Sequence, residues 1–209
     1  MKEVVFILLI SVISLNACND RKQTAGKDSI EQKTGGVAKD PAKDSAEIRT
    51  VITGFYNWYT KNYTKFEGYD LYNGIKKKDA PPYKINWDGV AKYQQFIRDS
   101  VPQLGEGFIA DQKHFFQQCD SAFKVDVEDD IPYGFDYDWY TNSQEDPQYL
   151  VGELNDKNSY WAVGLNGDAA TVNISVIRDI DGKPNRESVI TIAMKKENGK
   201  WTIAKIGDN

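Results

Sequence analysis

The sequence of 209 residues predicts an α+β domain in which helices come first and a meander of antiparallel strands follows. Apolar residues recur every three or four positions in the first half of the chain, as in helices, and alternate with polar residues in the second half, as in strands. We therefore expect a long N-terminal helix and two further helices packed on a curved antiparallel meander sheet. The last strand-like runs are joined by Asn166-Gly167, Asp181-Gly182 and Asn198-Gly199, which are typical of type I′ hairpin turns because both turn positions need positive φ.

Three helices are expected before residue 120. The first begins with Ser45 or Asp44 as its N-cap, because either side chain accepts hydrogen bonds from free backbone N–H groups. Its apolar stripe runs from Ile48 to Tyr63 and predicts one buried face. A long loop rich in glycine and proline, residues 66–88, separates it from the second helix. The expected helices cover residues 45–63, 87–99 and 103–118.

Five strands are expected in the second half. Residues 122–128 alternate apolar side chains with charged ones, which predicts a strand with one buried face. The four later runs are rich in β-branched and aromatic residues and lie on either side of the hairpin turns. They cover residues 159–165, 169–178, 186–196 and 200–206.

The first 17 residues have the composition of a secretory signal peptide. Lys2 supplies a short positive region, and the apolar run from Val4 to Ile13 is too short to span a membrane. The next residues, Leu15-Asn16-Ala17-Cys18, resemble the lipobox of bacterial lipoproteins. The resemblance implies cleavage before Cys18, acylation of Cys18 with chains such as palmitate, and stable anchoring in a membrane by two or three chains.

Residues 18–44 are expected to be a flexible tether. They contain no aromatic residue and little apolar material, so they bury too little surface to offset the entropy of ordering. Their positive and negative charges nearly balance, which argues against a polybasic membrane contact. The expected organisation is a signal peptide at 1–17, the acylated cysteine and tether at 18–44, and a single domain at 45–209.

The composition excludes several kinds of site. The chain has 26 Lys and Arg against 31 Asp and Glu, and this net charge of −5 argues against a nucleic-acid surface. A single histidine, His114, excludes any site that needs two imidazoles, and two cysteines exclude a cysteine-rich zinc site. With Cys18 acylated, Cys119 has no partner for a disulfide within the chain, and no cofactor is indicated.

Three segments carry a resemblance to a known fold. They are the helical run Phe55-Tyr56-Asn57-Trp58-Tyr59, the aromatic and acidic run at 136–146, and the closing run Asn198-Gly199-Lys200-Trp201 that leads into the last strand. Over about residues 46–209 they resemble an uncharacterised domain of bacterial envelope lipoproteins with the nuclear-transport-factor-2-like (cystatin-like cone) fold. The resemblance implies a curled sheet wrapped on a long helix, often with a pocket between them, although residues 66–88 are longer than expected. That superfamily includes isomerases, dehydratases, binding modules and scaffolds, so the fold alone selects no function.

An aromatic cavity is the first candidate site. Six aromatic residues are placed where they would line a cleft for an apolar or planar ligand. The alternative is that they only fill the core, as aromatic residues at helical spacing more often do. The candidates are Tyr56, Tyr59, Tyr63, Trp139, Tyr140 and Trp161.

An acidic stretch is the second candidate, since clustered carboxylates are ligands for Ca²⁺. Its spacing matches no EF-hand loop, and a solvated loop is the favoured interpretation, so no metal is predicted. The segment Asp179-Ile180-Asp181-Gly182 also has the residue types of a metal site, but its place between two predicted strands indicates a hairpin turn. The acidic residues are Asp126, Glu128, Asp129, Asp130, Asp136 and Asp138.

A catalytic site is the third candidate. An isomerase-like or hydrolase-like reaction needs a base in the pocket and a donor for developing negative charge, and His114 or Asp138 with Tyr140 as donor are the nominees. A nucleophile pair of Cys119 and His114 is disfavoured, because residues five apart lie on different faces of a helix. Cys119 is instead expected to be a buried small apolar residue.

Taken together, these features predict a lipid-anchored protein of the bacterial envelope, at the outer membrane on its periplasmic or surface side. The favoured role is a non-catalytic binding or interaction module with a protein partner at the envelope, and no enzymatic activity is predicted. One alternative is a small-molecule-binding protein or an isomerase-like or hydrolase-like enzyme that uses a cone cavity. Another is an immunity-type lipoprotein whose acidic face blocks a basic toxin.

Overall fold

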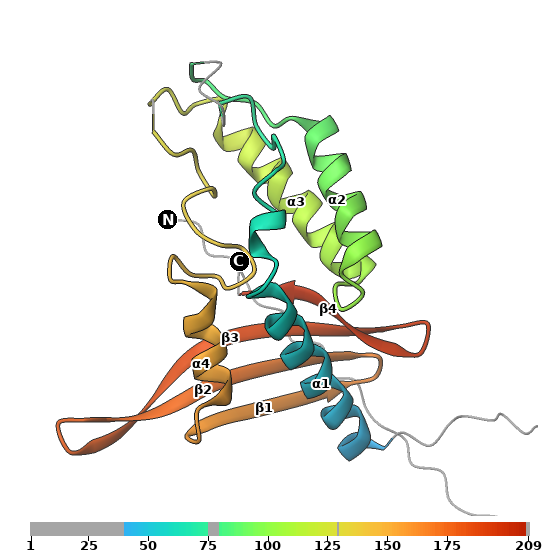
Figure 1. Ribbon diagram of the computed structural model, residues 1–209, viewed down its shortest axis with the longest axis vertical. Helices are drawn as coiled ribbons and strands as arrows, with labels where there is room; N and C mark the ends of the chain where they lie inside the picture. The colour runs from blue at the N-terminus through green and yellow to red at the C-terminus, as the bar shows by residue number, and fades with distance from the viewer. Residues whose placement is uncertain (1–39, 75–79, 129, 208–209) are drawn as a thin grey trace, which may run out of the picture. The chain divides into compact units, whose positions relative to one another are not determined.

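The structure is a computed structural model that describes residues 40–74, 80–128 and 130–207 (Figure 1). The described residues form four α-helices, one 3₁₀ helix and one sheet of four strands, so the predicted α+β class is confirmed. The elements are α1 (Pro41–Tyr59), η1 (Tyr63–Lys65), α2 (Trp87–Ser100), α3 (Glu106–Ala122), α4 (Pro147–Asn155), β1 (Ser159–Asn166), β2 (Ala169–Ile180), β3 (Lys183–Glu197) and β4 (Lys200–Ile206).

The sheet is an open antiparallel meander in the order β1-β2-β3-β4. Asp181-Gly182 and Asn198-Gly199 have positive φ at both positions, so the predicted type I′ turns are confirmed there. The first turn differs, because Asn166 pairs with Ala169 and the two turn residues are Gly167 and Asp168. Only Gly167 has positive φ, at 66°, which fits a type II′ turn with glycine in its first position.

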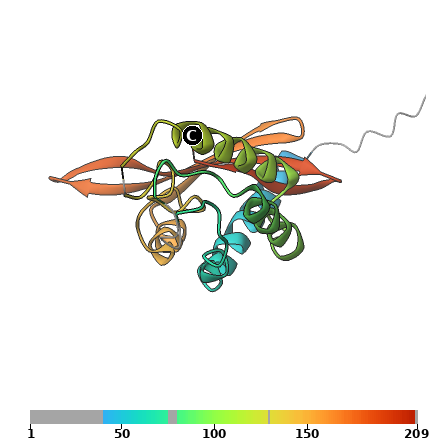
Figure 2. The ribbon, with the colours of Figure 1, turned by 90° about the horizontal axis from the view of Figure 1, so that it is seen from above.

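Helices α1 and α4 cover one face of this sheet, whereas α3 approaches the other face at β4 and leaves Thr171 and Asn173 of β2 exposed there. In Figure 2 the sheet is seen edge-on, with α4 and most of α1 on one side and α3 along the other. Alternate residues of β2, such as Val172 and Ile174, are fully buried on the α1 side, where Ile48, Ile52 and Phe55 pack. On the α3 side, Gly107 lies against Ala204 of β4 and leaves no room for a side chain.

The first helix begins four residues earlier than predicted. Asp40 is its N-cap and accepts hydrogen bonds from the N–H groups of Ala42 and Lys43, and Pro41 occupies the first turn. Asp44 is therefore inside the helix, so the end of the predicted tether at 18–44 is helical. The helix also ends earlier than predicted, at Tyr59, and Tyr63 belongs to η1.

The predicted strand at residues 122–128 is wrong. The helix α3 continues to Ala122, residues 123–125 form a turn, and residues 126–128 have no strand partner in the described part of the chain. Val125 and Val127 are 81% and 73% exposed, so the alternating pattern faces no core. Alternation predicts a strand only where another strand is available to complete its hydrogen bonds.

The predicted second helix, residues 87–99, is confirmed as α2, whereas the third is shifted towards the C-terminus. The helix α4 was missed, although Asp146 caps it and Pro147 begins it, which is a known start signal. The strand β3 begins at Lys183 instead of 186, because it pairs with β2 up to the turn.

Candidate functional site

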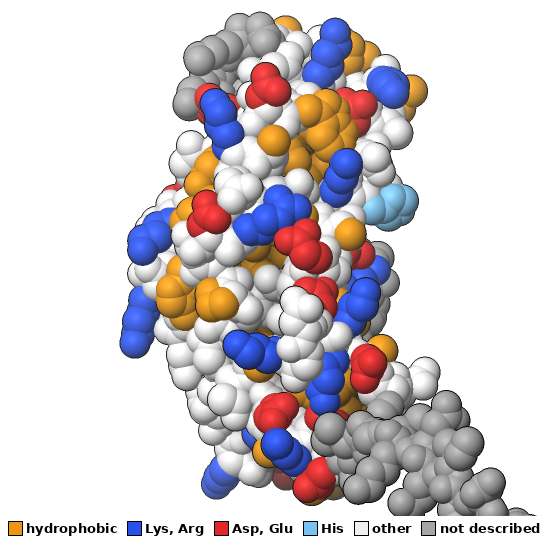
Figure 3. Space-filling model, turned by 90° about the vertical axis from the view of Figure 1, so that its right-hand side faces the viewer, with side chains coloured by type: hydrophobic (Ala, Val, Ile, Leu, Met, Phe, Trp, Pro, Cys, Tyr) orange, Lys and Arg blue, Asp and Glu red, His pale blue; other side chains and the backbone are white. Residues whose placement is uncertain are grey.

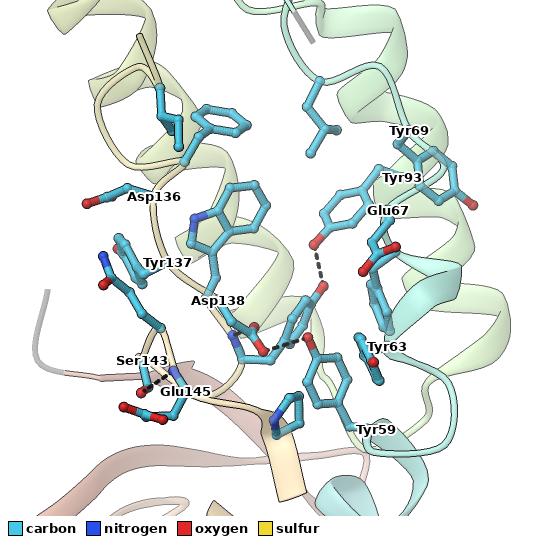
Figure 4. Close-up of a pocket in the computed structure, with 18 of the residues that line it drawn as sticks. Tyr59, Tyr63, Glu67, Tyr69, Tyr93, Asp136, Tyr137, Asp138, Ser143 and Glu145 are labelled. Atoms are coloured by element: carbon cyan, nitrogen blue, oxygen red, sulfur yellow. Dashed lines mark hydrogen bonds between the residues drawn. The ribbon is translucent and has the colours of Figure 1, made fainter. Parts of the chain in front are cut away.

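An open pocket of about 790 Å³ lies beside four of the predicted aromatic residues. One wall comes from the end of α1, η1, the loop after it and α2. The other wall comes from residues 131–147, the loop before α4. Figure 4 shows Tyr59, Tyr63, Glu67, Tyr69 and Tyr93 on one side, facing Asp136, Tyr137, Asp138, Ser143 and Glu145 on the other.

Aromatic rings form most of the pocket wall. Four of the six predicted cavity residues line it: Tyr59, Tyr63, Trp139 and Tyr140. The other two lie elsewhere. Tyr56 is buried behind the wall and its hydroxyl donates to the carbonyl oxygen of Tyr140, 2.9 Å away, while Trp161 lies on β1 under the guanidinium of Arg49. The further aromatic lining residues are Phe66, Tyr69, Tyr72, Tyr93, Phe135 and Tyr137.

A partly buried carboxylate, Asp138, lies in the pocket among these rings (Figure 4). The Tyr59 hydroxyl donates to its Oδ2 at 2.9 Å, and the N–H of Tyr140 donates to its Oδ1 at 2.8 Å. A short reversal of the chain positions it: Asp138 and Ser143 exchange backbone hydrogen bonds, and Asn142 takes a φ of 51° between them. The carboxylate is thus held in one place before any ligand arrives.

Burial raises the pKa of Asp138 above the usual range of a carboxyl group, and the hydrogen bonds from Tyr140 and Tyr59 oppose that rise. Burial, and then the nearby Asp138 charge, raise the pKa of Tyr59 as well. Tyr59 is therefore a neutral hydroxyl that donates to Asp138. The pair offers a ligand one negatively charged acceptor in a largely apolar setting.

A second hydrogen-bonded pair closes the bottom of the pocket. The hydroxyls of Tyr93 and Tyr140 are hydrogen-bonded to each other, and the amide of Gln112 lies 3.4 Å from the Tyr93 hydroxyl. Burial raises the pKa of both tyrosines. Since buried hydroxyls need partners, these bonds hold the rings of α2 and the 131–147 loop in a fixed relation.

Trp139 is oriented by the loop that carries it. Its indole N–H donates to the carbonyl oxygen of Gly134 at 2.6 Å. Trp139 therefore lines the pocket with its ring, while its N–H group is already bonded to the protein. Gly134 has a φ of 80°, and a side chain there would collide with Phe115 of α3. This turn brings Trp139 against the edge of Phe115, with the two planes at 63°.

The other predicted site residues lie outside this pocket. His114 is exposed on α3, and the histidine side chain projects from the surface in Figure 3. Cys119 is fully buried, as expected, and burial raises the pKa of its thiol to about 12, so it is not an activated nucleophile. Asp129 and Cys18 lie outside the described residues.

The acidic stretch does not converge on a metal site in the described residues. No group of three or more His, Cys, Asp or Glu side chains there is arranged to hold a metal ion. Glu128 and Asp130 are exposed and Asp126 is half-buried, whereas Asp136 and Asp138 line the pocket. The segment Asp179–Gly182 is a hairpin turn as expected, with the Gly182 N–H donating to Asp179.

Sequence reasoning missed the contribution of the 66–72 segment. Phe66, Tyr69, Leu71 and Tyr72 line the pocket, yet they lie in a loop with no periodic pattern. Their density of aromatic residues is the one local signal, because a loop that only bridges two helices seldom carries so many. Tyr93, from α2, lines the pocket as well.

Across the part of the chain that the structure describes, no helix combines the length and apolar composition that a membrane span requires. Comparison of the chain with known proteins finds no matching family model, no matching curated protein and no matching solved structure.

Proposed function

We propose that this protein is a non-catalytic binding module, anchored in the bacterial envelope, that holds a small organic molecule in the aromatic pocket. The observation that carries the proposal is the partly buried carboxylate of Asp138, held by Tyr59 and Tyr140 in an open pocket of about 790 Å³. This volume lies in the range of known ligand pockets, which are mostly apolar with a few fixed polar groups. A cone-like arrangement of the sheet around α1 is part of the same proposal.

The sequence favoured a protein partner, whereas the shape of the pocket favours a small-molecule ligand. An apolar patch on a flat surface is typical of a protein interface, whereas aromatic rings around a hollow are typical of a small-molecule site. The face in Figure 3 carries positive and negative side chains side by side, so it gives no support to an acidic toxin-binding face. The site therefore favours the small-molecule alternative over the immunity alternative.

Binding is favoured over catalysis because of how Asp138 is held. Both of its oxygens already accept hydrogen bonds from the protein, and these bonds stabilise the ionised form and oppose the rise in pKa that burial causes. Its raised pKa is the observation that supports the second candidate, a proton-transfer enzyme with Asp138 as the base.

Native mass spectrometry of the full chain, extracted gently from the membranes of the cells that make it, tests the binding proposal. We expect a small-molecule adduct on the wild type. Gln144→Trp, which places a large side chain at the exposed pocket rim, is expected to lose it. Gln117→Trp, at an exposed position of α3 away from the pocket, is the matched control and is expected to keep it. A bare wild type, or an adduct that survives Gln144→Trp, contradicts the proposal.

The membrane address is proposed from the lipobox at Leu15-Asn16-Ala17-Cys18. Two or three acyl chains on Cys18 give stable anchoring, because each buried methylene contributes about 0.8 kcal/mol. In cells fed an alkyne-tagged fatty acid, we expect the label on the wild type and on Cys119→Ser, and none on Cys18→Ser. If Cys18→Ser retains the label at the wild-type intensity per protein molecule, the proposed acylation of Cys18 is wrong.

A further inference from the structure

The rings and charges of the pocket indicate which chemical class of ligand it binds. This inference rests on the proposed binding function. We propose that the ligand is an organic ammonium ion, held by cation–π contacts with the aromatic wall and by the carboxylate of Asp138. Three properties of the described lining residues support this class of ligand: the sign of their charge, the angles between their rings, and the surroundings of Asp138.

The charge of the pocket is of one sign. The described lining residues include four carboxylates and no Lys, Arg or His. Glu67, Asp136 and Glu145 are exposed at the rim, and Asp138 lies partly buried inside. A hollow lined by one sign of charge with apolar walls attracts ions of the opposite sign and repels anions.

The rings meet at steep angles. Tyr69 and Tyr93 are inclined by 72° with centroids 5.4 Å apart, and Phe135 and Trp139 by 80° at 5.2 Å. Tyr59 and Phe66 are inclined by 62°. Such rings line a hollow from several directions and do not form a single flat platform for a planar ligand. A rounded ammonium group can contact several ring faces at once, and that is the arrangement that cation–π recognition uses.

Among the described residues, no cation pairs with the carboxylate of Asp138. The residues that donate hydrogen bonds to it, Tyr59, Tyr140 and Thr141, are all neutral, and none of the described residues forms an ion pair with it. A partly buried charge without a counter-charge is costly. A bound ammonium ion supplies the counter-charge. It also contacts the carboxylate closely or donates a hydrogen bond to it.

Isothermal titration with matched ligand pairs tests this inference. The probes are choline against its neutral carbon analogue 3,3-dimethylbutan-1-ol, and benzylammonium against benzyl alcohol. For at least one pair we expect the ammonium ion to bind the wild type at least tenfold more tightly than its neutral analogue. The aromatic contacts alone favour both members of a pair, so the ratio isolates the contribution of the charge.

Substitutions inside and outside the pocket test whether the preference for the ammonium ion arises there. Asp138→Asn keeps groups that can pair with Tyr59 and the Tyr140 N–H, and it is expected to lower the ratio at least fivefold. Asp111→Asn removes a half-buried carboxylate of a neighbouring hollow, which faces Lys205 at 3.9 Å, and it is expected to leave the ratio unchanged. Glu67→Gln, at the exposed rim, is the variant to use if thermal melting shows that Asp138→Asn does not fold, and it is expected to lower the ratio about twofold.

The outcomes separate this inference from the function on which it rests. Equal binding of ammonium and neutral probes, binding of neither, or a preference unaffected by both pocket substitutions overturns the ammonium class. A neutral or anionic adduct in the native mass spectrum, with no ammonium preference, overturns the ligand class and leaves the binding function standing. A bare protein that also binds no probe overturns both.

Discussion

Replacing Gly89 by alanine is expected to lower the free energy of unfolding by about 3 kcal/mol, a typical cost of forcing extra atoms into a packed region. Gly89 lies in the first turn of α2, and a Cβ atom there would collide with the backbone carbonyl oxygen of Asp70. Backbone cannot rotate away as a side chain can, so the 69–72 segment must move off the helix. Because Tyr69, Leu71 and Tyr72 line the pocket, ligand binding is expected to fall as well.

Gly152→Ala is the matched control for that prediction. Gly152 is also a helical glycine, in α4, but an added Cβ atom meets nothing within 4 Å. Alanine there is expected to stabilise the fold by about 0.5–1 kcal/mol, since it restricts the unfolded chain. Urea unfolding followed by circular dichroism measures both variants. Equal midpoints for Gly89→Ala and the wild type would show that Asp70 is not fixed against the helix.

The second large effect is expected from Asp44→Ala. The buried Asp44 accepts hydrogen bonds at one oxygen from the indole N–H of Trp201, 2.9 Å away, and from the ammonium of Lys196, 2.6 Å away. Removing this acceptor leaves the Trp201 N–H buried without a partner, which costs about 2 kcal/mol. The same hydrogen bonds join the first turns of α1 to β3 and β4. The helix start is therefore expected to become the first part of the domain to exchange its amide hydrogens.

A double-mutant cycle with Trp201→Phe checks the cause. Phenylalanine has no N–H, so Asp44→Ala is expected to cost less in that background than in the wild type. Lys43→Ala serves as the control, because its contact with Glu47 is exposed and 3.9 Å long, and such pairs contribute little. Strictly additive effects of Asp44→Ala and Trp201→Phe on urea unfolding would refute the hydrogen-bond explanation.

Local signals account for the elements that were predicted well. The turns at Asp181-Gly182 and Asn198-Gly199 were predictable because few residues adopt positive φ at two successive positions. The helix α2 was predictable because Asn86 caps it and its apolar residues keep one period. At Asn166-Gly167 the same kind of signal predicted the right place but the wrong turn type. The turn residues are Gly167 and Asp168, one position later than predicted, and Gly167 still occupies a position that needs positive φ.

The candidate site was predictable only in part, because its two walls are far apart in the sequence. Tyr59 and Asp138 are separated by 79 positions, and no spacing rule relates them. Of the aromatic candidates, Tyr59 and Tyr140 line the hollow, whereas Tyr56 packs behind it and Trp161 lies on another element. All four look alike in the sequence, since periodicity shows that a face is buried but not whether it is buried against protein or around a hollow.

The sequence by itself determined that helices precede a meander of strands, that hairpin turns lie at Asp181-Gly182 and Asn198-Gly199, and that a lipid anchor is expected, because each depends on residues close together in the chain. Only the tertiary structure decided that residues 122–128 have no strand to pair with and that Asp44 lies in a helix beneath Trp201. It also decided that Asp138 meets Tyr59 in an open pocket. These outcomes depend on which distant segments pack together, and burial, hydrogen-bond partners and cavities exist only once that packing is complete.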